Sequence, residues 1–175
     1  EPEGAVLGLS GLAQSYGAFE YGRLVLIGGR AGVGKSAIMT QMIYQDQLAG
    51  RKSAVVSLEM RGFPLINRLL AHGTGLNSRR IWAGSLGQAE WSAVVRVQAF
   101  LNSRNGIWID DYPAQRLDQI RAKLRRLVRE HAVKVVYVDY GGLVVRPGVR
   151  REYLEMEELS YDLARLASEL ENVVV

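Results

Sequence analysis

Short apolar runs alternate with amphipathic helical stretches along most of the chain. The apolar runs lie at residues 24–28, 53–57, 106–110 and 133–139. Helical spacing of apolar residues is found at 35–48, at 63–101 with breaks near 73–77 and 84–87, and at 115–131. A last stripe consists of Met156, Leu159, Leu163, Leu166 and Leu170. Buried strands separated by such helices are typical of a parallel sheet covered on both faces, so the pattern predicts an α/β fold.

The chain is long enough for one sizeable core. It has 175 residues, of which 48% are hydrophobic and 23% are charged, and we therefore expect a single domain. Residues 1–21, rich in glycine and small side chains, are interpreted as a lead-in segment, and residues 22–175 as the domain core. The final Asn-Val-Val-Val at 172–175 has the pattern of an opening strand. We therefore expect the core to be incomplete at its C-terminal end.

Composition narrows the possible locations and partners. The chain has no cysteine and two histidines, which excludes disulfides and thiolate metal sites and favours a reducing compartment. The longest apolar run is interrupted by Lys134 and Asp139, so we expect no membrane span and a cytoplasmic location. The net charge is +4, with 22 basic residues that are mostly arginine. Arginine dominance suits phosphate and nucleic-acid contacts, although a solvated arginine-rich surface explains it equally well.

A glycine-rich motif carries the clearest chemistry. Residues 29–36, Gly-Arg-Ala-Gly-Val-Gly-Lys-Ser, fit the P-loop pattern and lie between a predicted buried strand and a predicted helix. In such a loop the backbone N–H groups surround the phosphates, a lysine adds a positive charge, and the hydroxyl binds magnesium. The sequence therefore predicts a site for ATP and Mg²⁺. Its predicted nucleotide-binding residues are Gly29, Arg30, Ala31, Gly32, Val33, Gly34, Lys35 and Ser36.

Two further acidic positions complete the predicted site. Asp139 ends the apolar run at 133–139, where P-loop proteins place a carboxylate that supports the metal; with Ser36 it is the predicted metal-binding pair. Asp110 and Asp111 end another predicted strand and compete for this role. Glu59 follows the run at 53–57 and is the candidate catalytic base, with Lys35 as the second catalytic residue. Carboxyl ends of parallel strands share one sheet edge, so these groups can converge.

Several motifs together resemble the RecA-like motor domain of DnaB-type replicative helicases. They are Val-Val-Ser-Leu-Glu-Met at 55–60, Leu-Ile-Asn-Arg-Leu-Leu at 65–70, Ile-Trp-Ile-Asp-Asp at 107–111, Ile-Arg-Ala-Lys-Leu-Arg-Arg at 120–126, and Val-Tyr-Val-Asp-Tyr at 136–140. The resemblance implies a RecA-like P-loop NTPase fold in which Glu59 activates water and Asp139 supports magnesium. It also implies a hexameric ring that hydrolyses ATP to move along single-stranded DNA during replication.

Other classes of P-loop protein share parts of this pattern. A recombinase-like or circadian-clock-like ATPase that acts as a regulator without unwinding would share the fold. Gly141 and Gly142 favour this alternative, because they stand where the family has a bulky residue and a glutamine. A transporter ATPase is excluded because Tyr140 occupies the place of its catalytic glutamate, and a GTPase is disfavoured because no Asn-Lys-x-Asp motif occurs.

The remaining conspicuous residues allow a binding role or a plain structural one. Arg146, Arg150 and Arg151 lie in a loop with proline and glycine after the fourth apolar run. They could follow a nucleic-acid backbone or form a solvated connector. The arginines of 115–131 are interpreted as a solvated face, with a subunit or DNA surface as the alternative. The three tryptophans are interpreted as core or interface residues, with stacking on a base as the alternative.

Overall fold

The computed structural model describes residues 4–5, 17–30, 32–104, 106–113, 115–139 and 152–171. Its strands are β1 (Gly4–Ala5), β2 (Phe19–Glu20), β3 (Ser53–Ser57), β4 (Ile107–Asp110) and β5 (Val135–Asp139). Its helices are α2 (Lys35–Leu48), α3 (Gly62–Thr74), α4 (Ser78–Trp82), α5 (Gln88–Arg104), α6 (Leu117–His131) and α7 (Glu152–Glu169). The alternating α/β order predicted from the sequence is confirmed.

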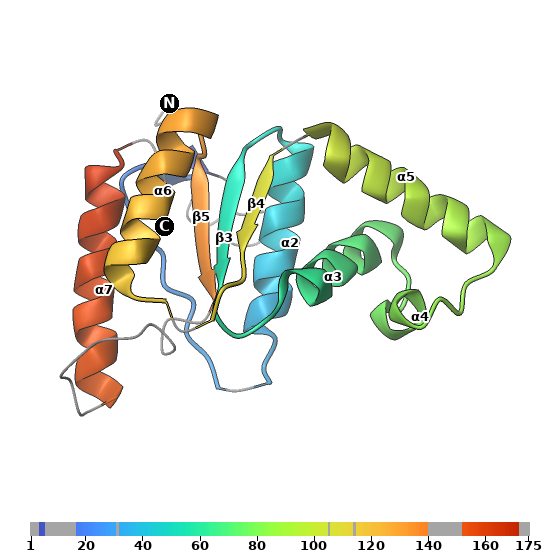
Figure 1. Cartoon of the computed structure of the whole chain (residues 1–175), viewed down its shortest axis with the longest axis horizontal. Coiled ribbons are helices and arrows are strands. Elements are labelled where there is room, and N and C mark those ends of the chain that lie inside the picture. The colour runs from blue at the N-terminus through green and yellow to red at the C-terminus, as the bar shows by residue number, and fades with distance from the viewer. Residues whose placement is uncertain are drawn as a thin grey trace.

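A parallel sheet with the strand order β4-β3-β5 forms the centre of the molecule (Figure 1). Its strands begin level with one another, since Ser53 pairs with both Ile107 and Val135. At the other edge, Ser57 lies opposite Asp139. The carboxyl ends of β3 and β5 are therefore adjacent, as the sequence predicts. A separate pair of short strands, β1 and β2, is antiparallel.

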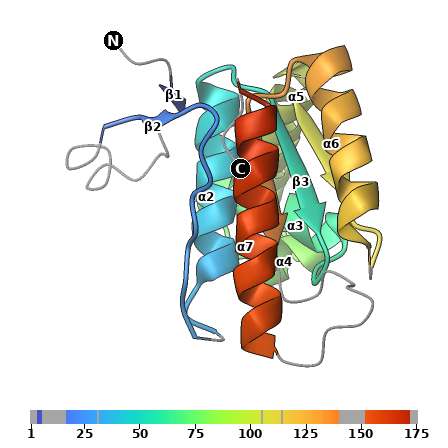
Figure 2. The same cartoon turned by 90° about the vertical axis from the view of Figure 1, so that its left-hand side faces the viewer.

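Alternating side chains of the sheet enter two hydrophobic clusters. Val56 and Val136 pack in a cluster with Leu166 of α7 and with α6. Val55 and Tyr137 enter the other cluster, with α2 and α3. Figures 1 and 2 show α6 and α7 on one side of the sheet and α2 on the other. A strand that is buried on both faces carries apolar residues at consecutive positions, which explains the continuous runs in the sequence.

The predicted first strand at 24–28 is wrong in one respect. This stretch forms no helix and no ladder with another described strand. Leu24 packs against one cluster and Val25 against the other, as in a strand, whereas Leu26 and Ile27 are 63% and 42% exposed. Only the start of this apolar run is therefore held by the core. The predicted strand at 172–175 lies outside the described residues.

The long helical region after β3 forms an arm of three helices. The predicted breaks occur at Gly75, whose φ of 70° ends α3, and at the turn before α5. Figure 1 shows α4 and α5 extending to the right of the sheet. None of the described helices is both long and apolar enough to cross a lipid bilayer.

Candidate active site

The glycine-rich loop at 29–34 leads directly into α2. Gly32 and Gly34 have φ values of 77° and 100°, a left-handed backbone that other residues rarely adopt. A Cβ atom on Gly29 would lie 2.8 Å from Cγ2 of Val33. The backbone therefore favours glycine at positions 32 and 34, and a side chain at position 29 would require Val33 to move. Ala31 lies outside the described residues.

The first turn of α2 is suited to bind an anion. Gly34 caps the helix without a side-chain hydrogen bond, and the first turn contains no acidic residue. The N–H groups at a helix start have no partners within the helix and carry a partial positive charge. Phosphate groups bind at such ends, so the position of this loop is consistent with the P-loop prediction.

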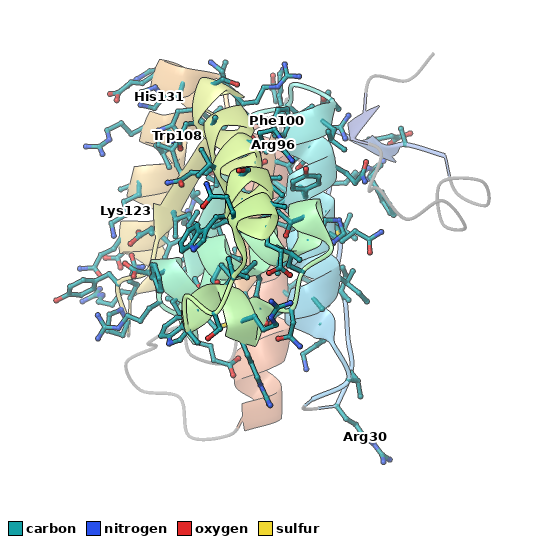
Figure 3. The ribbon with its side chains drawn as sticks, turned by 90° about the vertical axis from the view of Figure 1, so that its right-hand side faces the viewer. Arg30, Arg96, Phe100, Trp108, Lys123 and His131 are labelled. Atoms are coloured by element: carbon teal, nitrogen blue, oxygen red, sulfur yellow. The ribbon has the colours of Figure 1, made fainter. Side chains whose placement is uncertain are left out.

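Lys35 lies across the loop. Its Nζ donates hydrogen bonds to the carbonyl oxygens of Gly29, at 2.9 Å, and Arg30, at 3.0 Å. The ammonium group is thus held at the mouth of the loop, where a phosphate would meet it. Figure 3 shows the Arg30 side chain projecting away from the body of the molecule at this end.

Ser36 and Asp139 meet at the carboxyl edge of the sheet. The Ser36 hydroxyl donates a hydrogen bond of 2.8 Å to Oδ2 of Asp139. Asp139 is 8% exposed, and it ends β5 on the face that packs against α2, two residues after Tyr137. A hydroxyl and a carboxylate oxygen in contact can serve together as ligands of one hard cation. The two predicted metal ligands are therefore adjacent.

The two competing aspartates have other partners. Asp110 Oδ2 accepts a hydrogen bond of 2.6 Å from Nζ of Lys123. Asp111 Oδ2 accepts one of 2.9 Å from the backbone N–H of Gly62, at the start of α3. Among these three aspartates, Asp139 is the one that contacts the helix of the P-loop.

Glu59 follows β3 at the carboxyl edge of the sheet and has an exposed side chain. It belongs to the turn that follows β3, and the N–H group of the preceding Leu58 donates a 2.6 Å hydrogen bond to the carbonyl oxygen of Asp139. The Ser57 hydroxyl donates to the carbonyl oxygen of Met60 at 2.5 Å, which closes the turn. This geometry places the candidate base at the same edge as the P-loop.

A buried polar cluster at the opposite end of α2 was missed by the sequence analysis. The Asp46 carboxylate accepts hydrogen bonds from Tyr137 (2.6 Å), Ser53 (3.2 Å) and Arg51 (2.9 Å). Burial raises the pKa of Asp46, although its hydrogen bonds with Tyr137 and Arg51 oppose the rise. Burial, followed by the charge of Asp46, raises the pKa of Tyr137 well above its usual value. Tyr137 therefore remains a donor at neutral pH.

A sequence signal for this cluster exists in α2. The buried positions of the helix are Met39, Thr40, Met42, Ile43, Asp46 and Gln47. Asp46 and Gln47 thus continue the core-facing stripe of the helix as polar residues. Polar groups at core positions require hydrogen-bond partners, so their presence in the stripe predicts a buried network.

The structure describes some of the remaining residues singled out in the sequence and not others. Arg146, Arg150 and Arg151, as well as Tyr140, Gly141 and Gly142, lie outside the described residues. Arg121 and Arg125 of α6 form ion pairs with Glu169 of α7 at 2.9 and 2.5 Å, so they join two helices. The hydrogen bond with Arg125 lowers the pKa of Glu169.

The tryptophans occupy different environments. Trp108 stacks on His131, with ring centroids 4.7 Å apart and planes at 19° (Figure 3). Trp82 is 58% exposed and meets Phe63 edge-on, and Trp91 is 44% exposed. The core interpretation thus fits Trp108 better than the two tryptophans of the arm.

The donor set at the predicted metal site suits magnesium. Among the described residues, no group of three or more His, Cys, Asp or Glu side chains could hold a metal ion. Magnesium usually takes one or two protein ligands and completes its shell with water and substrate phosphates. Ser36 and Asp139 fit this requirement. A groove of about 630 Å³ between residues 22–24 and α7 shares no residue with this site.

Comparison with known proteins identifies the family. The family model of the DnaB-like helicase C-terminal domain matches residues 4–175. The chain is 30% identical over 175 residues to the replicative DNA helicase DnaC of Bacillus subtilis (strain 168) and 31% identical over 178 residues to the replicative DNA helicase DnaB of Geobacillus stearothermophilus. These alignments cover 98% and 100% of the chain, but the chain spans only 38% and 39% of the relatives' length.

Solved structures share the fold. One solved ATPase domain superposes with a TM-score of 0.89 at 24% identity, covering 98% of this chain and 62% of that one. A DnaB-like replicative helicase, described with its interactions with primase, also gives 0.89 at 23% identity, covering 99% and 44%. The predicted RecA-like fold is therefore confirmed, and the helicase interpretation is favoured over the recombinase-like or clock-like alternative. The chain belongs to the family of DnaB-like helicase C-terminal domains.

Proposed function

We propose that this chain binds magnesium-ATP at the P-loop and hydrolyses it, and that the full gene product uses this reaction to move along single-stranded DNA. The observation that carries the proposal is the contact between Ser36, at the start of α2, and Asp139, at the end of β5. It joins the phosphate-binding helix end to the carboxylate that a magnesium site requires. Family membership supports nucleotide use by the same domain.

In the proposed reaction the loop and α2 bind the phosphates. Backbone N–H groups of the loop and the Lys35 ammonium would donate to the β- and γ-phosphate oxygens. Ser36 and Asp139 would hold magnesium, which when bound neutralises charge on these phosphates. The carbonyl groups of Gly29 and Arg30, which hold Lys35 in the structure, keep its ammonium within reach of the loop.

Glu59 is proposed as the general base. Its carboxylate would accept a proton from water while the water oxygen bonds to the γ-phosphorus and the bond from that phosphorus to the β-phosphate oxygen breaks. The products are ADP and inorganic phosphate. Support comes from the turn after β3, where the Leu58 N–H group donates a hydrogen bond to the Asp139 carbonyl oxygen. This contact brings Glu59, the next residue, to the proposed metal-binding edge.

Replacing this base tests the proposal. We expect Glu59→Gln to bind magnesium-ATP with unchanged affinity but to hydrolyse it about a hundredfold more slowly, because a positioned base contributes on this scale. Steady-state phosphate release by the full gene product and titration with a fluorescent ATP analogue measure the two quantities. Turnover within about twofold of the wild type would assign the base to another residue.

The proposed DNA partner rests on different residues. We propose that the full gene product forms a hexameric ring and that Arg146, Arg150 and Arg151 contact the backbone of single-stranded DNA. The support is the charge of this segment and its place after β5, together with the relatives named replicative DNA helicases. Each phosphate that an arginine neutralises releases counterions, so binding weakens as the salt concentration rises.

The salt dependence of binding tests this contact. We expect the double variant Arg150→Ala with Arg151→Ala to bind single-stranded DNA more weakly, with a slope of log K against log salt that is shallower by about 0.7 per lost phosphate contact. Fluorescence anisotropy with a labelled oligonucleotide gives this slope. An unchanged slope would make the segment a connector between β5 and α7.

A further inference from the structure

The turn that carries Glu59 is fastened at three points. At its start, the Leu58 N–H group donates to the Asp139 carbonyl oxygen at 2.6 Å. Within it, the Ser57 hydroxyl donates to the Met60 carbonyl oxygen at 2.5 Å. At its end, where α3 begins, the Gly62 N–H group donates to Oδ2 of Asp111 at 2.9 Å. The last of these bonds is made by a side chain that directly follows a different strand, β4.

Asp111 supplies the capping group that the start of α3 lacks. The N-cap residue Arg61 makes no side-chain capping bond, and no residue of the first turn is acidic. Pro64 has no N–H group, so Gly62 and Phe63 are the donors left at this helix end. A carboxylate bonded to Gly62 satisfies one of them and favours the positive end of the helix dipole.

The approach of α3 to the end of β4 is close. A Cβ atom on Gly62 would lie 3.4 Å from Cγ2 of Ile109 and 3.6 Å from Oδ2 of Asp111. These are van der Waals distances, so the helix start lies directly against the strand end. The neighbouring Asp110 faces another partner, Lys123, and does not share this contact.

We infer that Asp111 is a positioning residue for Glu59: through Gly62 it fixes the far end of the Glu59 turn to β4 and so holds the carboxylate at the metal-binding edge. The inference rests on the proposed role of Glu59 as the base. Without Asp111, the turn keeps its attachments to β3 and β5 but loses its only described side-chain attachment to β4. Small displacements of a catalytic group reduce turnover steeply, whereas phosphate binding by the P-loop does not depend on this turn.

Kinetics of Asp111 variants in the full gene product test the inference. We expect Asp111→Ala to lower kcat for ATP at least about tenfold with the affinity for magnesium-ATP within about twofold of the wild type. Asp111→Asn, whose amide oxygen can still accept from Gly62, should recover most of kcat. Asp118→Ala is the matched control, since Asp118 lies in the first turn of α6 and pairs only with Arg116 in the described contacts.

Combination with Glu59→Gln separates positioning from general support of the fold. If Asp111 acts through Glu59, Asp111→Ala should cause no further loss of kcat in the Glu59→Gln protein. An equal loss in both backgrounds, an unchanged kcat in Asp111→Ala, or no recovery by Asp111→Asn would overturn the inference while leaving the base in place. Wild-type turnover of Glu59→Gln would instead overturn the proposed base itself. Circular dichroism of each variant confirms that it is folded.

Discussion

The helix α2 is attached to the strand β5 near both of its ends, and the two attachments differ. At the phosphate end, one hydrogen bond joins Ser36 to Asp139, beside a glycine-rich loop whose residues are mostly exposed. At the distal end, the 1% exposed Asp46 accepts three side-chain hydrogen bonds, including one from Tyr137 of the same strand. The distal end of α2 thus contributes buried hydrogen bonds to the stability of the fold. Its other end leaves polar groups available for a ligand.

The largest expected effect comes from a change at the P-loop end of α2 alone. Lys35→Ala should weaken magnesium-ATP binding on the order of a hundredfold, which corresponds to about 2.7 kcal/mol, because the charged donor to the phosphates is lost. The free energy of unfolding should change little, since Lys35 bonds only to exposed loop carbonyls in the described structure. Titration with a fluorescent ATP analogue and urea unfolding measure the two effects.

A second lysine variant is the control for the loss of one positive charge. Lys52→Ala removes the same charge next to the start of β3 and should leave nucleotide affinity unchanged. Equal losses of affinity in Lys35→Ala and Lys52→Ala would show that net charge, rather than the P-loop, governs binding.

The next largest effect comes from removing a hydrogen bond at the distal end of α2. Tyr137→Phe removes the donor of a buried 2.6 Å hydrogen bond to Asp46 and should lower the free energy of unfolding by about 1.5–3 kcal/mol, the range for bonds to a charged group. Urea midpoints of the wild type and the variant measure this loss. Tyr161→Phe is the control, because Tyr161 is 71% exposed. A Tyr137→Phe protein of normal stability but poor ATP affinity would contradict the separation of the two ends.

The pH dependence of stability tests the distal end further. Because burial raises the pKa of Asp46 above its unfolded value of 3.8, folding favours the protonated carboxyl. The stability contributed by this shift is fully present below pH 3.8 and is lost as the pH rises through the folded pKa. The stability advantage of the wild type over Asp46→Asn should therefore shrink as the pH rises from 3.8 through the folded pKa, by at most about 1.4 kcal/mol per pH unit.

Paired urea titrations of the wild type and Asp46→Asn across this range give the difference directly. Other titrating groups are common to both proteins and cancel in the subtraction. A difference that grows with pH would mean that hydrogen bonds with Arg51 and Tyr137 outweigh the burial of the charge.

Local patterns in the sequence predicted the elements around the site well. The helix at 35–48 and the strand at 53–57 have the predicted bounds, because a strand buried on both faces and a P-loop helix each leave an uninterrupted local signal. The convergence of Ser36 and Asp139 followed from the shared edge of parallel strands. The roles assigned to Glu59, Lys35, Ser36 and Asp139 remain predictions.

Contacts between distant segments were the part that the sequence could not supply. Tyr137 and Asp46 are 91 residues apart, and nothing near either residue specifies the other as its partner. Asp111 was considered only as a metal ligand, since its bond to Gly62 depends on how closely α3 approaches β4. The run at 24–28 was predicted as a strand because apolar composition alone does not reveal whether a neighbouring strand pairs with it.

Helix α5 is the segment that we expect to unfold locally before the rest of the domain. Of its 17 residues only Val94 and Leu101 are buried, whereas every residue of β3 is buried. Segments with few buried contacts unfold locally at a lower free energy than the whole domain. Amide hydrogens of α5 should therefore exchange with solvent before those of the sheet, and a protease should cut this arm first. The first cooperative unit to open would leave α2, β3 and β5 assembled.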